Sequence, residues 1–137
     1  PLKCALRELE EETRGVVNLR SCEYTTFSFN IRQRNTVDNV EIISIYQVFI
    51  FFCRYNQHEQ NRLVRRFYDA KAKTDVRKKA KLPIRKTYDE NDMMSFDTLE
   101  EYKARPRKWD IIVKNVVQNN EFYQALNSLN RKCFNLR

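Results

Sequence analysis

The chain has 137 residues, of which 42% are hydrophobic and 32% charged, and its formal net charge is +8. This length suits one domain with a real core, and the composition excludes a disordered chain. The four cysteines are scattered without a Cys-x-x-Cys pair and His58 is the only histidine, which argues against a zinc site.

The N-terminal segment 2–13 has the pattern of an amphipathic helix. Leu2, Leu6 and Leu9 recur at helical spacing, and acidic side chains occupy the other side. The only glycine, Gly15, follows directly. Because glycine tolerates the left-handed conformation in which many helices end, we expect the helix to stop there.

Two strands are predicted next. Residues 18–31 and 40–55 are rich in β-branched and aromatic side chains, and the polar connection between them is typical of a hairpin loop. The second strand is almost continuously apolar, so we expect it to be central. Its apolar run, 42–53, is shorter than the roughly 20 residues that span a bilayer. With no signal-peptide pattern, we expect an intracellular, cytoplasmic protein with reduced thiols and no membrane partner.

A basic helical segment follows the strands. Residues 56–82 are polar and contain good helix formers, and Pro83 is expected to end the helix. The stretch 62–86 holds 11 Lys or Arg against two Asp, which gives it a charge of +9 and leaves about −1 for the rest of the chain. Such a segment favours a polyanionic partner such as RNA, although a solvated helix face is an equal alternative. The residues that would contact a phosphate backbone are Arg77, Lys78, Lys79, Lys81, Arg85 and Lys86.

A short strand and a short helix are predicted beyond the basic segment. Residues 93–96 fit a strand, and Asp97 with Glu100 three residues later matches a helix cap. Pro106 is expected to close that helix.

The C-terminal tail, about 109–137, carries apolar residues at near-helical spacing, which predicts one or two helices. Trp109 is expected to anchor them. The apolar positions are Ile112, Val113, Val116, Val117, Phe122, Leu126 and Leu129.

The stretch RELEEE places four glutamates within five positions, 8–12. At about 100° per residue, Glu8, Glu11 and Glu12 fall within an arc of roughly 100° on a helix, while Glu10 points elsewhere. Carboxylates this close raise one another's pKa unless a cation neutralises them. Oxygen ligands of this kind suit Mg²⁺ or a similar divalent ion, and a solvated acidic helix face is the plainer alternative.

Residues 7–12 resemble the R-E-U-x-E-E core of the Nudix box, in which U is an aliphatic residue. The resemblance implies a Nudix-type α/β/α sandwich with a mixed sheet, and a Mg²⁺- or Mn²⁺-dependent hydrolase. Its substrate would be a nucleoside diphosphate derivative, either ADP-ribose-like or the capped 5′ end of RNA. By position, Glu8, Glu11 and Glu12 would bind the metal, with Leu9 as the buried aliphatic residue and Arg7 in a structural ion pair.

The rest of the chain extends the resemblance. The segment 89–102 is similar to the acidic loop, strand and capped helix found later in that family. The general base would be one of the metal-binding glutamates or a loop acid; Glu90 is the candidate, with Asp92 and Glu101 behind it, and a solvated loop residue is the plainer alternative for Glu90. The combination with a basic insertion, about 56–86, is similar to the baculovirus ADP-ribose pyrophosphatases and, more distantly, to poxvirus decapping enzymes. The resemblance thus implies one Nudix-like domain over 1–137 that lacks the N-terminal part of the fold.

Two departures from the Nudix pattern stand out. The glycine and glutamate that precede the arginine in the family are absent here, so we expect this chain by itself to turn over weakly or not at all. The family's glycine two places after the last glutamate is replaced by Arg14, which a helix end shifted by one residue, to Gly15, would explain. A nucleic-acid-binding module and a degenerate Nudix scaffold for protein partners therefore remain as alternatives.

Overall fold

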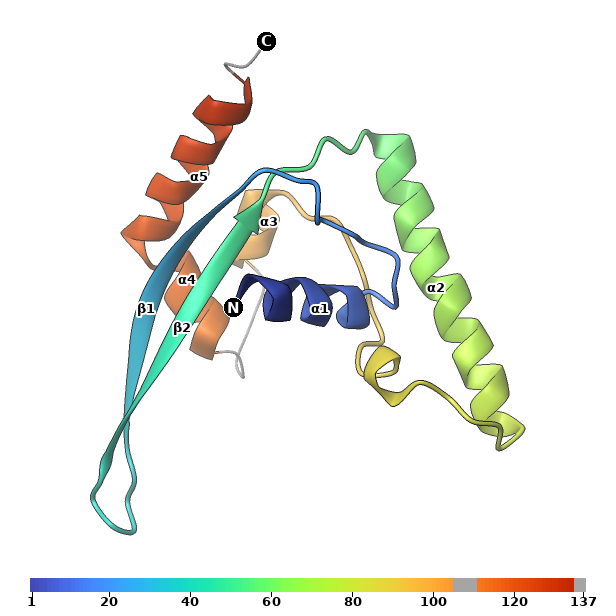
Figure 1. The fold of residues 1–137 in the computed structure, drawn as a ribbon, viewed down its shortest axis with the longest axis horizontal. Coiled ribbons are helices and arrows are strands. Elements are labelled where there is room, and N and C mark those ends of the chain that lie inside the picture. Colours follow the sequence, from blue (N-terminus) through green and yellow to red (C-terminus); the bar gives the residue numbers. More distant parts are fainter. Residues whose placement is uncertain (105–110, 135–137) are drawn as a thin grey trace. The chain divides into compact units, whose positions relative to one another are not determined.

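The computed structural model describes residues 1–104 and 111–134 (Figure 1). The chain divides into two compact units, Pro1–Cys22 with Cys53–Pro106, and Glu23–Phe52 with Arg107–Arg137. The described elements are α1 (Leu2–Glu12), β1 (Tyr24–Arg34), β2 (Glu41–Phe51), α2 (Gln57–Lys79), the 3-10 turn η1 (Lys86–Tyr88), α3 (Leu99–Ala104), α4 (Ile111–Val117) and α5 (Asn120–Phe134). Helices thus combine with a sheet, as the broad α/β class predicted from the sequence requires.

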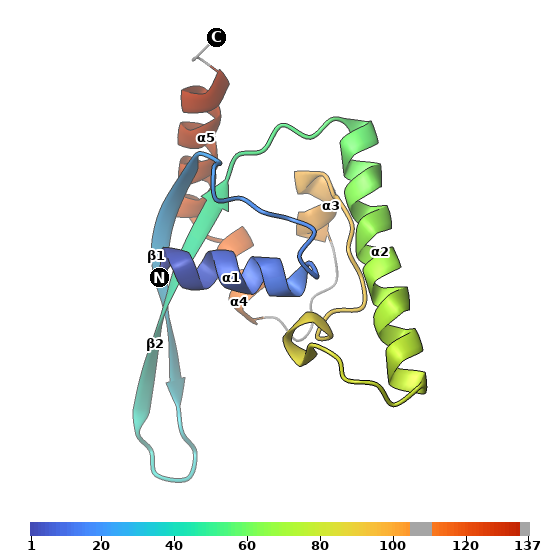
Figure 2. The ribbon, with the colours of Figure 1, turned by 45° about the vertical axis from the view of Figure 1, so that its right-hand side comes forward.

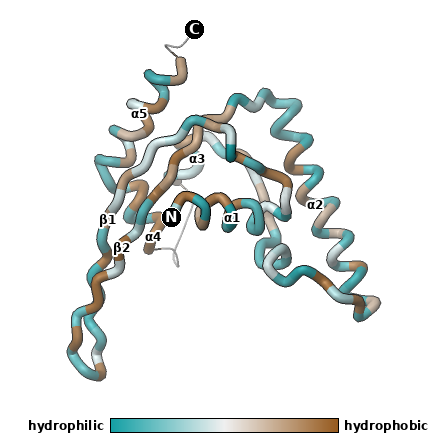
Figure 3. The backbone as a smooth tube through the Cα atoms, viewed as in Figure 1, coloured by the Kyte–Doolittle hydropathy of each residue, from teal (hydrophilic) through white to brown (hydrophobic). Residues whose placement is uncertain are grey.

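The first unit is built around α2, whose start is fixed by a capping box. The Asn56 Oδ1 atom accepts a hydrogen bond from the Glu59 amide at 2.8 Å, and the Glu59 Oε1 atom accepts one from the Asn56 amide at 3.5 Å. Figure 3 shows that α2 is mostly hydrophilic. Its buried residues are Leu63 and Phe67, and Phe67 is fully enclosed, so a narrow apolar stripe holds the helix to its unit.

The helix predicted over 56–82 is therefore confirmed, with a different end. The helix stops at Lys79, and Lys81 takes a left-handed φ of 55°. The amide of Leu82 closes this turn by donating to the Arg77 carbonyl at 2.9 Å. This is a Schellman end, so the chain leaves the helix before Pro83 is reached.

Two predictions for the following segment are wrong. Residues 93–96 form no strand, because they pair with no other backbone segment in the described chain. The cap of α3 is Thr98 with Glu101, whose reciprocal hydrogen bonds are both 3.1 Å long, and not Asp97 with Glu100. Both pairs have the same spacing, so the sequence pattern could not separate them.

The second unit contains the predicted hairpin, which Figure 1 shows as two long antiparallel strands. Their register runs from Tyr24 opposite Phe51 to Arg34 opposite Glu41. The first strand starts six residues later than predicted, because residues 19–22 form a turn closed by the Cys22 amide and the Leu19 carbonyl at 3.0 Å. Helix α5 packs on β1, and the core of the unit combines Phe27, Val116 and Phe122.

The prediction that the second strand is central is wrong for the described residues, in which β2 pairs with β1 alone. Ile42, Ile43 and Ile45 of β2 are 50%, 51% and 74% exposed. The predicted C-terminal helices are confirmed as α4 and α5, whereas Pro106 and Trp109 lie outside the described residues. None of the described helices is long and apolar enough to cross a membrane.

Candidate acidic site

Helix α1 carries the acidic trio on a surface that is open to solvent. None of its residues is buried, and Leu9, expected to be a buried aliphatic residue, is only half-buried. Glu8 and Glu12 are exposed and Glu11 is half-buried. Arg7 forms an ion pair with its neighbour Glu8, with 3.4 Å between Nη2 and Oε1, and both side chains are largely exposed.

The carboxylate of Glu12 lies in a negative electrostatic field. Its pKa is raised above the ordinary value of 4.5, first because the surrounding chain removes part of its solvent shell, and then because Glu8 and Glu90 lie close by. The residue as a whole is nevertheless exposed. The structure thus brings the predicted metal ligands Glu8 and Glu12 near the predicted general base Glu90.

The trio does not close around a common point. The charge of Glu11 acts on Tyr88, as a minor cause of the raised pKa of that phenol, which burial and the hydrogen bond to Glu10 raise most. In the ranges 1–104 and 111–134, no three His, Cys, Asp or Glu side chains are close enough to enclose a metal ion.

Glu10 has a separate, structural role on the other side of the helix. Its carboxylate accepts hydrogen bonds from Arg20 Nη2 and from the Tyr88 hydroxyl, both at 3.1 Å. These contacts lower its pKa, with the Arg20 hydrogen bond as the largest cause. The sequence-based separation of Glu10 from the trio therefore agrees with the contacts that it makes.

The end of α1 is a Schellman motif in which Arg14 occupies the usual glycine position. The Gly15 amide donates to the Glu10 carbonyl at 2.7 Å, and the Arg14 amide donates to the Glu11 carbonyl at 3.1 Å. Arg14 and Gly15 have φ values of 56° and 77°. The expected shift of the helix end is therefore wrong: Arg14 itself adopts the left-handed conformation that favours glycine.

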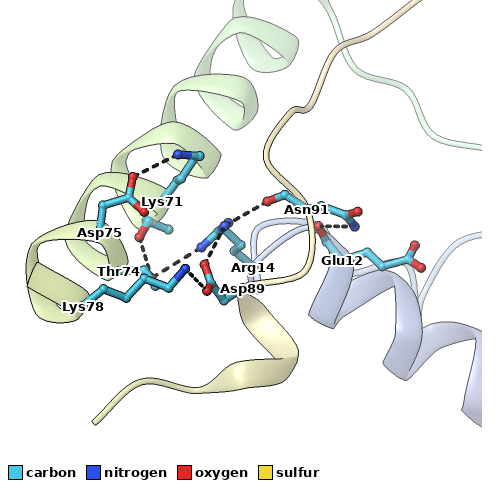
Figure 4. A network of polar contacts seen from close by, with 9 residues as sticks. Glu12, Arg14, Lys71, Thr74, Asp75, Lys78, Asp89 and Asn91 are labelled. Atoms are coloured by element: carbon cyan, nitrogen blue, oxygen red, sulfur yellow. Dashed lines mark hydrogen bonds and ion pairs between the residues drawn. The ribbon is translucent and has the colours of Figure 1, made fainter. Parts of the chain in front are cut away.

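The Arg14 side chain is 2% exposed and fixes three segments of the first unit (Figure 4). Its Nη2 atom donates to the Asn91 carbonyl at 2.8 Å and lies 3.4 Å from an Asp89 oxygen, while Nη1 donates to Thr74 of α2 at 3.4 Å. The guanidinium also lies 5.4 Å from the ring centre of Phe67. These contacts offset the cost of its backbone conformation.

The same network holds the Glu90 loop against the end of α1. The Asn91 side-chain amide donates to the Glu12 carbonyl at 3.3 Å, and Figure 4 shows the Glu12 carboxylate pointing away from the Arg14 guanidinium. Figure 2 shows η1 beside this end of the helix. Sequence reasoning missed Arg14, although an arginine in a position that calls for glycine was the available signal.

The six predicted basic contacts divide into two groups. Lys78 pairs with Asp89, the Arg77 Nε atom donates to the Pro83 carbonyl at 2.9 Å, and Arg85 stacks 4.0 Å from the centre of the Tyr88 ring. These three therefore hold the structure together. The other three are exposed and form no ion pair with the described residues: Lys79, Lys81 and Lys86.

A separate pocket of about 480 Å³ lies in the first unit, between the start of α2 and residues 94–98. Phe96 lines it and packs edge-on against Tyr55, with 6.2 Å between ring centres. Glu101 lines it too, but this alternative base accepts the capping hydrogen bond from Thr98. Asp92, the other alternative, is exposed and is a minor cause of the raised pKa of Lys71, which the hydrogen bond to Asp75 raises most.

Comparisons with protein-family models, with curated proteins and with solved structures found no match for this chain.

Proposed function

We propose that the chain is a Nudix-type hydrolase that cleaves the diphosphate linkage of a nucleoside diphosphate derivative with the help of Mg²⁺ or Mn²⁺. The observation that supports this best is that the loop residue Glu90 and the helix residue Glu8 both act on the carboxylate of Glu12, whose pKa is raised first by burial and then by these two charges. If the acidic trio were only a solvated helix face, there would be no reason for an acidic residue from a distant loop to lie close to it. Here the Arg14 network holds that loop in place.

The donor set fits a hard divalent cation. Glu8, Glu11 and Glu12 offer only oxygen atoms, which Mg²⁺ prefers, and their long side chains can reorient from one helix face. When bound, the ion would lower the pKa of a coordinated water and offset the charge of the phosphates. Glu90 would accept the proton of the attacking water, and Asn91 and Arg14 would keep its loop in position.

The substrate class follows from two further features. Phe96 provides an aromatic face in a pocket large enough for a nucleoside. Three exposed cationic side chains can bind the additional phosphates of an RNA, which favours a capped RNA over ADP-ribose; they belong to Lys79, Lys81 and Lys86. An RNA substrate should therefore lose affinity when these lysines are replaced, whereas ADP-ribose should not.

The first test measures cation binding by this chain, because binding does not depend on turnover. A ligand present at about 100 times its Kd stabilises the folded state by about 2.7 kcal/mol. Mn²⁺ should therefore raise the Tm of the wild type and of Glu10→Gln, but not that of Glu12→Gln. Glu10→Gln is the matched control, because it removes the same charge from the same helix outside the trio. An equal response of all three proteins would contradict the assignment.

The second test measures hydrolysis of ADP-ribose and of capped RNA. Turnover should require Mg²⁺ or Mn²⁺ and should fall by orders of magnitude in Glu11→Gln and Glu12→Gln, with the fold kept. Full activity of the two variants would refute the proposal.

A nucleic-acid-binding module is the second candidate, supported by the three exposed lysines. In that case, RNA binding should fall steeply with salt and should ignore Mg²⁺. Glu12→Gln would then bind RNA as well as the wild type and no hydrolysis would be seen.

A further inference from the structure

Cys22 and Cys53 face each other at the base of the hairpin. Their Sγ atoms are 3.6 Å apart and both residues are half-buried. The register of the sheet explains this placement, since Tyr24 lies opposite Phe51 and the Phe52 amide donates to the Glu23 carbonyl at 2.8 Å. The next residues outward are Cys22, at the end of the turn 19–22, and Cys53.

The short distance between the two sulfur atoms suits a disulfide. A disulfide bond is about 2.05 Å long, so the Sγ atoms, which are 3.6 Å apart, would approach by about 1.5 Å. Rotation of the two side chains can supply a movement of this size, while the hydrogen bond from the Phe52 amide to the Glu23 carbonyl holds the neighbouring backbone segments together.

We propose that Cys22 and Cys53 form a reversible dithiol–disulfide pair that closes the hairpin at its base. The oxidant is a small-molecule disulfide such as oxidised glutathione. One cysteine, as its thiolate, attacks a sulfur of that disulfide and releases one small thiol. The second cysteine then attacks the mixed disulfide and releases the other. The two cysteines lose two protons and two electrons, and the small disulfide becomes two thiols.

The surroundings of Cys53 favour a disulfide that persists once it has formed. Burial and its contact with Cys22 raise the pKa of the Cys53 thiol to about 12, although the Tyr55 hydroxyl acts in the opposite direction. The thiolate is therefore not stabilised in the reduced protein. Dithiols whose reduced form is stabilised make oxidising disulfides, and this pair lacks that feature.

Closing the pair would constrain the path of the chain. The chain passes from the first unit to the second between residues 22 and 23, and it returns between 52 and 53. A bond between the two cysteines would join both passages and would enclose the entire hairpin in one covalent loop. We infer that oxidation restricts opening of the hairpin at its base.

The experiment exposes the full chain to a series of oxidised and reduced glutathione mixtures, followed by alkylation and tryptic peptide mapping. Each of the four cysteines falls in a different tryptic peptide, because Lys or Arg residues separate them. The expected product joins peptide 21–32 to peptide 35–54 within a monomer. Cys22→Ser and Cys53→Ser should each abolish it, and Cys4→Ser, which removes an exposed thiol, should keep it.

A second measurement covers the case in which a variant folds poorly. The urea midpoint of the oxidised wild type should be higher than that of the reduced wild type, and reduction should reverse the shift. The proposal fails if the 21–32 to 35–54 link is absent while Cys4 forms mixed disulfides with glutathione. It also fails if the link occurs only in covalent dimers.

Discussion

Arg14→Gly tests whether the arginine side chain holds the end of α1 in place. The chain contains a matched control, because Lys81 occupies the same left-handed position of a Schellman motif at the end of α2. Arg14 has a buried side chain, whereas Lys81 is exposed, and its side chain forms no hydrogen bond or ion pair with the described residues. Substitution by glycine therefore has the same effect on the backbone at both sites. The difference in stability between the two variants then measures the contribution of the Arg14 side chain.

The expected magnitudes follow from the contacts. A non-glycine residue in the left-handed region costs about 1–2 kcal/mol, and glycine loses about 0.5–1 kcal/mol through its greater freedom in the unfolded chain. Lys81→Gly should therefore be neutral or stabilising by up to about 1 kcal/mol. Arg14→Gly additionally loses a charge-assisted hydrogen bond to the Asn91 carbonyl, worth about 1.5–3 kcal/mol, and leaves that acceptor without its partner. We expect a net loss of about 2 kcal/mol.

Urea unfolding followed by circular dichroism measures both variants. With a slope of about 1–3 kcal/mol per molar urea, the midpoint of Arg14→Gly should fall by about 1 M while that of Lys81→Gly stays or rises. If Arg14→Gly loses no more stability than Lys81→Gly, the buried contacts of the Arg14 side chain contribute nothing to the free energy of unfolding. Loss of the Mn²⁺ response in Arg14→Gly, with Lys81→Gly unaffected, would further support a positioning role for Arg14.

Three further predictions concern charge and capping. The pKa of Glu12 is raised in the folded state, so its contribution to stability is present below about pH 4.5 and is lost as the pH rises through the folded pKa. Glu12→Gln should therefore raise the urea midpoint at pH 7 and leave it unchanged at pH 4. The pKa of Asp89 is lowered, first by Lys78, so its contribution is present above pH 3.8 and is lost as the pH falls; Asp89→Asn should lower the midpoint at pH 7 and have little effect at pH 2. Asn56→Ala removes the cap of α2 and should cost about 1 kcal/mol by urea unfolding, a loss that Asn56→Asp should largely avoid.

Much of the secondary structure could be predicted because it depends on local signals. Leucines at helical spacing predicted α1, and a polar connection between two β-rich segments predicted the hairpin. Helix α2 begins at Gln57, one residue after the predicted start, because Asn56 and Glu59 form a capping box at that position. Each of these signals involves residues that are close together in the sequence, so it can be recognised without knowledge of the tertiary structure.

The errors arise where partners lie far apart or where local signals are duplicated. The second strand was expected to be central because it is apolar, yet apolar character does not specify which strands pair with it. Asp97 and Thr98 both precede an acid at the capping distance, and the pattern cannot choose between them. The contacts of Arg14 join residues 14, 74, 89 and 91, a set that no periodicity brings together.

The candidate site was predictable only in part for the same reason. The helix face of Glu8, Glu11 and Glu12 followed from the helical repeat, and the resemblance to the Nudix box suggested Glu90. The loop that brings Glu90 near Glu12 is held by Asn91, and the six basic residues between 77 and 86 differ in the contacts that they make. Pairing of this kind depends on the tertiary structure, so three of the six basic residues proved to be structural.

Two residues at the end of α1, Arg14 and Glu12, are in unfavourable surroundings, and the chain compensates for only one of them. Arg14 adopts an unfavourable backbone conformation, and its own side chain compensates through Asn91, Asp89 and Thr74. Glu12 experiences the repulsion of Glu8 and Glu90, and no Lys or Arg among the described residues forms an ion pair with it. Under the proposed function, a bound cation would offset this repulsion, and the loop that Arg14 holds would keep Glu90 near Glu12.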